Sequence, residues 1–417
     1  MGSRQVEIAI IGGGIAGLAL AIGLHRRGIQ SRVYEAAPQV REIGVGITLL
    51  PHAMREIADL GLLDAIRSSG IETQASEFYN RFGQKLYGEP RGLVAGYALP
   101  EVAINRGRLH AILYQEALAR LGHERIVTDR ALIDLQQDDR TVTLGFKATS
   151  SGTAVAPVHA DIAIGCDGVN SVTRKVFYPD DKVVFTGINT WRGVTRRKPI
   201  LDGRTYFRVG SLRTGKMVIY PITDLADGSG DQLINWVAEI ERPSSTMNDW
   251  NRGGRLEDFL PTFEGWRFDW LDVGQLIRDA DAVLEYPMVD KDPLSQWTFG
   301  RVTLAGDAAH PMYPRGSNGS AQGLIDARTL ADQLAAGGDP QAALKAYEAI
   351  RLEPTGKIVQ TNRTAPPDII NMRVEELTGD RPFDNLDDHI SQDELRRLSD
   401  DYKRVAGFMM PTLASAN

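Results

Sequence analysis

Three stretches of the chain share one pattern, in which a short apolar run ends at glycines or an acid and then continues into a helix. They are Val6–Gly28 ("VEIAIIGGGIAGLALAIGLHRRG"), Ala160–Lys175 ("ADIAIGCDGVNSVTRK") and Gly300–His310 ("GRVTLAGDAAH"), the last leading to a helix near 321–337. Runs that are apolar on both faces are typical of parallel strands whose two faces are covered by helices. The pattern therefore predicts an α/β fold built on a parallel sheet.

The pattern changes between the second and third of these stretches. The segments "RTYFRVG", "KMVIYPI" and "QLINWVAEI" are short, β-branched and aromatic, and turn-forming residues separate them, which indicates antiparallel strands. We therefore predict an inserted antiparallel β-sheet domain from 76–97 and 185–286, which would hold the substrate. Residues 1–75, 98–184 and 287–366 would form the first domain, and 367–417 a charged C-terminal helical segment that packs on the rest or forms an interface.

Composition removes several classes of function. The net charge of −7 over 417 residues argues against a nucleic-acid partner, which needs a basic surface. The single cysteine excludes a disulfide framework, and the seven histidines form no metal-binding spacing, so we expect no metal. Residues 8–24 carry no charge, but Glu7 interrupts the basic leader that a signal peptide requires, so we expect no membrane segment. We expect a cytoplasmic monomer or homodimer, although a low cysteine count also fits other compartments.

The first strand ends in a G-x-G-x-x-G motif made by Gly12, Gly14 and Gly17, and Glu35 ends the next strand. This is the Rossmann-like arrangement for a dinucleotide, with the pyrophosphate on the helix N-terminus and the acid on a ribose hydroxyl. The motif alone does not separate FAD from NAD. Two later acid-tipped strand ends, at Asp167 and Asp307, favour the longer FAD, although either acid can also serve as a helix N-cap.

With these motifs in view, the chain resembles the flavoprotein aromatic hydroxylases of the para-hydroxybenzoate hydroxylase type, which are single-component FAD monooxygenases. The resemblance rests on "GxGxxG…E", "DGVNSVTR" and "GDAAHPMYP" and extends from about residue 6 to residue 363. Further segments resemble the phenazine hydroxylases of that family: "GVGITLLPHA", "INRGRL", "TWRGVT", "DWNRGGRLEDFLP", "YPMVDKDPL" and "YPRGSNGSAQ".

The resemblance implies a set of FAD-binding residues spread over seven segments of the chain. They are Gly12, Gly14, Ile15, Ala16 and Gly17 at the pyrophosphate; Glu35 and Ala36 at the adenosine ribose; Arg41, Gly46 and Ile47 along the flavin; Arg106 at the phosphate or ribityl region; Asp167 and Gly168 in a segment tied to both FAD and NAD(P)H use; Gly306 and Asp307 at a ribityl hydroxyl; and Pro314, Gly316, Ser317, Asn318 and Gly319 at the isoalloxazine ring. The last segment departs from the common P-x-x-G-Q-G-x-N pattern, which leaves the hydrogen bonds around the flavin edge open.

The resemblance also implies the reaction. NADH or NADPH would reduce FAD, O₂ would form a C4a-hydroperoxyflavin, and one oxygen atom would pass to an electron-rich aromatic or heteroaromatic ring, with or without decarboxylation. The same fold also carries epoxidases and reductases of non-aromatic substrates, which remain an alternative. A phenazine, a benzoate, an indole and a polyketide phenol are all open as substrates.

The candidate substrate-contacting residues come from the inserted sheet and the loop after Asp307, and each has core packing as its alternative. They are Tyr206, Met217, Tyr220, Trp236, Met288, Met312 and Tyr313. Arg192 and Arg315 are candidates to pair with a substrate carboxylate, with a surface ion pair as the alternative. His310 is a candidate general base, but a structural hydrogen bond near the strand end is the stronger hypothesis.

Overall fold

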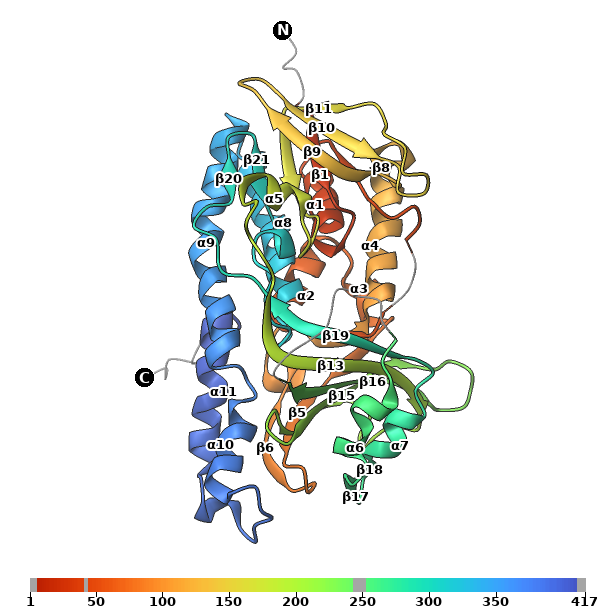
Figure 1. The fold of residues 1–417 in the computed structure, drawn as a ribbon, viewed down its shortest axis with the longest axis vertical. Coiled ribbons are helices and arrows are strands. Elements are labelled where there is room, and N and C mark those ends of the chain that lie inside the picture. The colour runs from red at the N-terminus through yellow and green to blue at the C-terminus, as the bar shows by residue number, and fades with distance from the viewer. Residues whose placement is uncertain (1–5, 41–43, 243–252, 411–417) are drawn as a thin grey trace.

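The structure is a computed structural model, described for residues 6–40, 44–242 and 253–410. One end of the molecule contains a six-stranded sheet (Figure 1). Its order is β20 (Thr298–Phe299), β21 (Val302–Leu304), β12 (Ile162–Gly165), β1 (Ile8–Ile11), β2 (Ser31–Tyr34) and β8 (Ile126–Val127). All neighbours are parallel except β20 and β21. The three stretches with the shared pattern thus contribute β1, β12 and β21 to one sheet, as predicted.

Different elements cover the two faces of this parallel sheet. Ile8 and Ile10 of β1 face a core made with helices, whereas Ala9 and Ile11 face a core made with a small antiparallel sheet. The helices are α1 (Ile15–Arg26), α2 (Pro51–Asp59), α3 (Leu63–Arg67), α4 (Arg106–Leu121) and α8 (Gly319–Ala335). The small sheet comprises β9 (Ala131–Gln137), β10 (Val142–Lys147) and β11 (Val158–Ala160), with α5 (Val172–Phe177) beside it. Both faces of the sheet are therefore covered, as predicted, one by helices and the other mainly by the small antiparallel sheet together with α5.

The other end contains a seven-stranded sheet. Its order is β19 (Val283–Asp290), β13 (Val184–Arg197), β16 (Gln232–Glu241), β15 (Gly215–Asp224), β14 (Thr205–Ser211), β5 (Ala75–Tyr79) and β6 (Lys85–Pro90). All pairs are antiparallel except β14 and β5, which run parallel. Most strands come from the two segments expected to form the inserted domain, and β19 runs on to Asp290, beyond the expected boundary at 286.

The two faces of the seven-stranded sheet also differ. One face forms a core with α6 (Leu260–Phe263), α7 (Val273–Arg278) and the short strands β17 (Arg267–Phe268) and β18 (Leu271–Asp272). The other face looks toward the parallel-sheet end and meets the three-stranded sheet of β3 (Gly46–Leu49), β7 (Glu101–Asn105) and β4 (Ile71–Thr73). We call this second face the inner face. We call the region where the inner face meets the parallel-sheet end of the molecule the seam, and the inner face forms one wall of it.

The chain ends in helices that lie along one side of the molecule (Figure 1). They are α9 (Pro340–Thr364), α10 (Ile369–Thr378) and α11 (Gln392–Ala406); short 3₁₀ turns occur at Gly92–Ala95, His123–Arg125, Leu256–Asp258, Gly306–Ala308 and Leu386–Asp388. The buried residues of α11 are Leu395, Ser399, Tyr402 and Ala406, a narrow stripe that packs inward. The predicted C-terminal helical segment is therefore present and packed, and most of its charges point outward.

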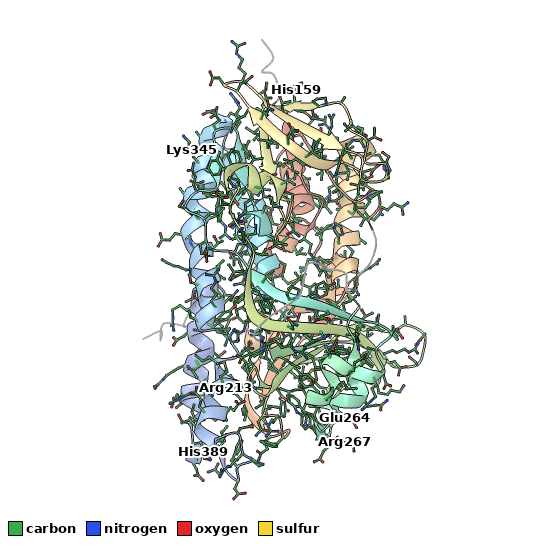
Figure 2. The ribbon with its side chains drawn as sticks, in the orientation of Figure 1. His159, Arg213, Glu264, Arg267, Lys345 and His389 are labelled. Atoms are coloured by element: carbon green, nitrogen blue, oxygen red, sulfur yellow. The ribbon has the colours of Figure 1, made fainter. Side chains whose placement is uncertain are left out.

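The molecule is elongated, and the labelled side chains in Figure 2 mark its extent. His159 and Lys345 lie at the parallel-sheet end, and Glu264 and Arg267 lie at the opposite end. Within the described residues, no helix combines the length and the apolar character needed to cross a membrane.

Candidate active site

The turn after β1 contains glycines with different constraints. A Cβ on Gly12, whose φ is +105°, would overlap the carbonyl oxygen of Cys166, and one on Gly17 would overlap the carbonyl oxygen of Gly12. A Cβ on Gly14 would meet nothing within 4 Å, because open space lies in front of this residue. Gly12 and Gly17 are therefore needed for packing, whereas Gly14 leaves room for a group that approaches the N-terminus of α1. This geometry fits a dinucleotide pyrophosphate.

Glu35, at the end of β2, lies directly beside this turn. Its carboxylate accepts hydrogen bonds from the backbone N–H of Gly13 at 2.6 Å and of Ala37 at 2.7 Å. Ala36, the residue after Glu35, is exposed. His110 of α4, which the sequence analysis did not identify, lies with Nε2 2.6 Å from the carbonyl oxygen of Gly13. The acid expected at the adenosine ribose is thus held next to the open space at Gly14.

The second acid-tipped strand end has a local role. Asp167 accepts hydrogen bonds from the Ser171 hydroxyl at 2.5 Å and from the backbone N–H and hydroxyl of Thr173 at 3.0 and 3.1 Å. Gly168, with a φ of +76°, allows the turn that follows. Arg174 of α5 donates to the carbonyl oxygens of Ala308 and Ala309, so this segment is tied to the third strand end. Asp167 therefore orders its own loop and the start of α5, although the N-cap of that helix is Ser171, and the contact of Asp167 with FAD stays a prediction.

Asp307 follows β21 and is exposed, although every other residue from Val302 to Pro311 is buried. Its neighbour Gly306 donates its backbone N–H to the carboxylate of Asp326 at 2.9 Å. The strand end therefore presents one carboxylate outward while buried bonds hold its backbone, as a residue that binds a ribityl hydroxyl requires.

Asp326 of α8 is the centre of a buried polar network that the sequence analysis missed. Besides Gly306, its carboxylate contacts His310 Nε2 at 2.6 Å and accepts a hydrogen bond from Arg351 Nε at 2.8 Å. Burial raises the pKa of Asp326, but His310 and Arg351 outweigh that effect and lower the pKa to about 2. His310 is buried and bound to this carboxylate, which favours a structural role over that of a general base. A signal was present, because Asp326 interrupts the apolar face of α8.

The loop at 314–319 links β21 to α8. Pro314 is exposed, and Gly316 (φ +108°) and Ser317 (φ +56°) both adopt left-handed conformations. A Cβ on Gly316 would overlap the Tyr402 hydroxyl, so α11 packs directly against the loop. Asn318 precedes Gly319, the first residue of α8, and its side-chain oxygen lies 2.8 Å from His52 Nε2 and 3.1 Å from Gln322 Nε2. The unusual loop sequence is thus held by partners from α2, α8 and α11.

Gly46 and Ile47 lie on β3, at the seam. Gly46 donates its N–H to Asn235 of β16 at 2.6 Å, and a Cβ here would crowd the side chains of Asn235 and Ile222. Ile47 packs on the main core, and the exposed Arg106 begins α4 near Arg192. Arg41, expected along the flavin, lies outside the described residues.

Two of the candidate substrate-contacting residues were assigned to the wrong face. Met217 and Trp236 lie in the core under α6 and α7, and Trp236 Nε1 donates to Thr195 there at 3.0 Å. The predictions were wrong because both faces of β15 and β16 are apolar, so alternation does not reveal which side is inner. Tyr206 and Tyr220 stack on the inner face with ring centroids 4.8 Å apart.

The remaining substrate candidates lie on the seam side. Met288 of β19 packs with Tyr313 of the loop in a small cluster, and Met312 beside it is half-buried. The structure thus brings Tyr206, Tyr220, Met288 and Tyr313 to the same side of the seven-stranded sheet.

Arg192 is a half-buried cation on the inner face of β13. Its guanidinium lies 5.7 Å from the Tyr286 ring, and its buried Nε has no hydrogen-bond partner. No carboxylate among the described residues forms an ion pair with it, and burial and nearby Arg106 lower its pKa. A cation without a counter-ion in a seam fits the binding of an anionic group better than the alternative surface ion pair.

Five buried charges, which we call the charge cluster, form a second feature of the seam. Lys216 Nζ lies 2.9 Å from Glu239 and 2.7 Å from Asp368, and Arg315 Nε lies 3.0 Å from Asp368. Arg208 lies 4.0 Å from the same carboxylate. The cluster joins the inner face, the 314–319 loop and the start of α10, and it has one more cation than anions. Nη2 of Arg315 is buried and has no partner.

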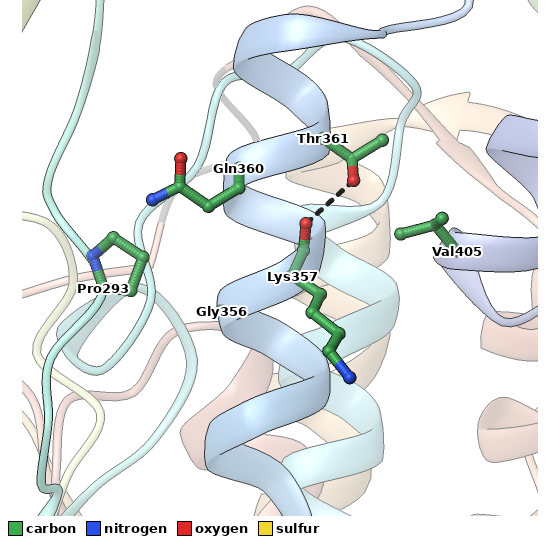
Figure 3. A pocket seen from close by; sticks show the side chains of 6 residues that line it. All are labelled: Pro293, Gly356, Lys357, Gln360, Thr361 and Val405. Atoms are coloured by element: carbon green, nitrogen blue, oxygen red, sulfur yellow. Dashed lines mark hydrogen bonds between the residues drawn. The ribbon is translucent and has the colours of Figure 1, made fainter.

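A groove elsewhere lacks comparable chemistry. It has a volume of about 440 Å³, and its lining residues are Pro293, Gly356, Lys357, Gln360, Thr361 and Val405 (Figure 3). Lys357 is its one titratable side chain, and the Thr361 hydroxyl bonds within α9 to the Lys357 carbonyl. In the part of the chain that the structure describes, no three His, Cys, Asp or Glu side chains gather as a metal site. The seam is therefore the candidate active site.

Comparison with known proteins identifies the family of this chain and the cofactor of that family. Residues 5–191 and 288–362, more than half of the chain, match a family model described as an FAD binding domain. The chain is 38% identical over 366 residues to a phenazine 1,6-dicarboxylic acid hydroxylase of Lysobacter antibioticus, covering 87% of this chain and 90% of that protein. The chain belongs to the family of FAD-dependent aromatic hydroxylases.

Other members of the family support this assignment. A 3-hydroxybenzoate 6-hydroxylase of Polaromonas naphthalenivorans is 30% identical, covering 86% of this chain and 87% of that protein. The FAD complex of HpxO from Klebsiella pneumoniae (R204Q variant) superposes with a TM-score of 0.75 at 21% identity over 97% of each chain, which confirms the predicted fold. The FAD-dependent monooxygenase predicted from the sequence is therefore confirmed at the level of family and enzyme class.

Proposed function

We propose that this FAD-dependent monooxygenase uses NADH or NADPH and O₂ to hydroxylate an anionic, electron-rich aromatic substrate in the seam. The observation that carries the substrate part of the proposal is Arg192, a cation on the inner face with an unbonded Nε and no carboxylate partner among the described residues. A substrate carboxylate would supply the missing counter-ion and fix the orientation of the ring.

The redox and oxygen chemistry is that of bound FAD, which accepts a hydride from the nicotinamide and activates O₂. The chain's own residues bind and orient. The open space at Gly14 and the carboxylate of Glu35 would hold the pyrophosphate and adenosine ribose, and exposed Asp307 a ribityl hydroxyl. Tyr206, Tyr220, Met288 and Tyr313, all buried, would exclude water from one side of the substrate.

The relatives narrow the choice of substrate to test first. One is named for phenazine-1,6-dicarboxylate, and another for 3-hydroxybenzoate, so aromatic carboxylates recur among them. The motifs "TWRGVT" and "YPRGSNGSAQ" also resemble 5-methylphenazine-1-carboxylate 1-monooxygenase. We therefore propose a phenazine carboxylate as the substrate and hydroxylation, with or without loss of the carboxylate, as the reaction.

The test is a substrate screen with the FAD-loaded enzyme. Phenazine-1,6-dicarboxylate, phenazine-1-carboxylate, 5-methylphenazine-1-carboxylate and 3-hydroxybenzoate are each mixed with NADH or NADPH, and nucleotide oxidation, hydrogen peroxide and product are followed together. We expect a phenazine carboxylate to stimulate nucleotide oxidation and to yield stoichiometric hydroxylated product with little peroxide. Folded, FAD-loaded protein that none of these compounds stimulates would overturn the proposal, and stimulation that yields only peroxide would mark an effector instead of a substrate.

A further inference from the structure

The strand register places the inner-face side chains in rows across the sheet. Arg192 of β13 is paired with Val237 of β16, Val237 with Val218 of β15, and Val218 with Arg208 of β14. Paired residues point to the same side of a sheet, so these four side chains form one row with a cation at each end. At about 4.8 Å per strand, the backbones of the two end residues are separated by roughly 14 Å.

The middle of this row is apolar and open. Val218 and Val237 belong to the inner-face cluster with Tyr206 and Tyr220, yet Val237 is only half-buried although it lies on a central strand. A half-buried valine in the middle of a sheet indicates space in front of it. A flat apolar ring system fits this floor, and a span of this length accommodates several fused rings better than one.

The two ends of the row differ in how their charge is balanced. At one end, Arg192 has no carboxylate partner among the described residues. At the other end lies the charge cluster, in which Arg208, Lys216 and Arg315 pair with Glu239 and Asp368, while the buried Glu101 also attracts Arg208. Every member of the cluster is less than 9% exposed, so a charged donor left without a partner here is shielded from water and costly.

One donor in the charge cluster is free. Arg208 uses Nη1 on the Ser76 hydroxyl at 2.7 Å, and Lys216 bonds to both acids. Arg315 uses Nε on Asp368, but its Nη2 is buried without a partner, and the side chain is only 7% exposed. A buried guanidinium N–H without an acceptor is costly, and a ligand anion would satisfy this donor.

We propose that Arg315 is a second anion subsite, and that the substrate is a multi-ring aromatic with an anionic group at each end. One carboxylate lies on Arg192, the rings lie over Val237 and Val218, and the other carboxylate lies on Nη2 of Arg315. The inference rests on the proposed function and deepens it, since it assigns the substrate class and a specificity-determining residue. No bond is made or broken at either subsite.

The test measures binding without turnover. Phenazine-1,6-dicarboxylate and phenazine-1-carboxylate are titrated anaerobically into the oxidised FAD-loaded enzyme, and Kd is taken from the change in flavin absorbance. The third probe is the half-amide, in which one carboxylate of the dicarboxylate is converted to the amide. It tests the second subsite in the wild-type enzyme, without any substitution. The variants are Arg315→Met, Arg192→Met and the control Arg213→Met, whose exposed arginine pairs with Glu376 (Figure 2).

We expect the wild type to bind the dicarboxylate at least about tenfold more tightly than the monocarboxylate or the half-amide, as a charge-assisted hydrogen bond predicts. Arg315→Met should reduce this ratio to about threefold or less and leave the monocarboxylate Kd nearly unchanged, because Asp368 keeps Lys216 as its partner. Arg192→Met should weaken both ligands, and Arg213→Met neither.

Equal affinity of the wild type for all three probes would overturn the second subsite and leave the proposed function standing, as would equal weakening of both carboxylates by Arg315→Met. Binding of none of the probes by folded, FAD-loaded enzyme would instead overturn the proposed phenazine substrate, and the second subsite with it. The half-amide comparison decides the question even if Arg315→Met fails to fold.

Discussion

At the scale of single residues, the glycines of the first turn divide into those that the fold needs and one that it does not. Gly12 and Gly17 have no room for a side chain, because each approaches a backbone carbonyl. Gly14 has open space in front of it and a backbone conformation, φ −76° and ψ −173°, that any residue adopts. Packing therefore requires glycine at positions 12 and 17, whereas at position 14 we expect cofactor binding to require it.

Gly14→Val should leave the fold intact and prevent FAD binding. We expect the melting temperature of the FAD-free variant to stay within about 2 °C of wild type, because surface changes away from packing contacts cost little. FAD affinity should fall at least about tenfold, since the new methyl groups occupy the pyrophosphate space. Circular dichroism and a fluorescence titration measure the two effects. Gly17→Ala is the control that should lose stability, and wild-type FAD affinity in Gly14→Val would contradict the assignment.

Arg192→Met should act on substrate binding and spare the flavin. A charge-assisted hydrogen bond is worth about 1.5–3 kcal/mol, so KM for a carboxylated substrate should rise by roughly 10- to 100-fold. FAD content should not change. Steady-state kinetics with the carboxylate and its amide provide the measurement, since the amide should be insensitive to the variant. Arg196→Met is the matched control, because Arg196 lies on the same strand, is exposed and pairs with Asp227 and Asp231. Equal effects of the two substitutions would contradict the role of Arg192.

At the scale of elements, α8 holds the strand end at Gly306 through Asp326. This one carboxylate satisfies a backbone N–H, His310 and Arg351, all of them buried. Such a network holds the backbone next to Asp307 in place. The partners of Asp326 are at positions 306, 310 and 351, so the acid on the apolar face of α8 marks the network but no local spacing reveals its partners.

Asp326→Asn should destabilise the protein, because it leaves Arg351 buried without a counter-charge, a loss of about 3–5 kcal/mol. The folded pKa of about 2 lies below the ordinary value of 3.8, so the carboxylate stabilises the fold above about pH 4 and this stabilisation is lost as pH falls toward 2. Urea denaturation at pH 7 and at pH 3 measures both effects. Asp332→Asn on the exposed side of α8 is the control, and a wild-type free energy of unfolding in Asp326→Asn would refute this role.

The elements also show what the sequence could predict. The sequence predicted the βα pattern, the inserted antiparallel sheet and the cofactor turn, because each depends on residues that are neighbours in the chain, such as Gly12 to Gly17. Met217 and Trp236 were placed on the wrong face because β15 and β16 are covered on both sides. The charge cluster could not be predicted from the sequence, because Lys216, Arg315 and Asp368 meet only when three distant segments pack together.

At the scale of the whole molecule, the C-terminal segment packs against α2, which is formed by residues near the N-terminus. Phe408 stacks on His52 of α2 with ring centroids 5.2 Å apart, and Leu50, Tyr402 and Ala406 surround this pair. His52 also contacts Asn318 of the 314–319 loop. Burial lowers the pKa of His52 to about 4, so this junction of three segments contains a neutral imidazole.

Whole-chain stability should therefore depend on His52 in mildly acidic solution. The folded pKa of about 4 lies below the ordinary 6.5, so the unfolded chain binds a proton first and stability falls as pH decreases from 6.5 to 4. The contribution is at most about 3 kcal/mol. Denaturation of wild type and His52→Gln across this range measures it, because the glutamine amide can still donate to Asn318. Identical pH dependence of the two proteins would contradict the prediction.

The helix α9 has a mechanical consequence for the catalytic cycle. It packs against α8 and β20 at the parallel-sheet end and against α11 toward the other end (Figure 1). Its 25 residues span roughly 37 Å at 1.5 Å per residue, so a single helix, with Pro354 in its interior, contacts both halves. A helix that contacts both halves resists rotation of the two sheets away from each other. We therefore expect ligands to enter and leave through local shifts of loops, while the row of side chains across the sheet keeps a constant length.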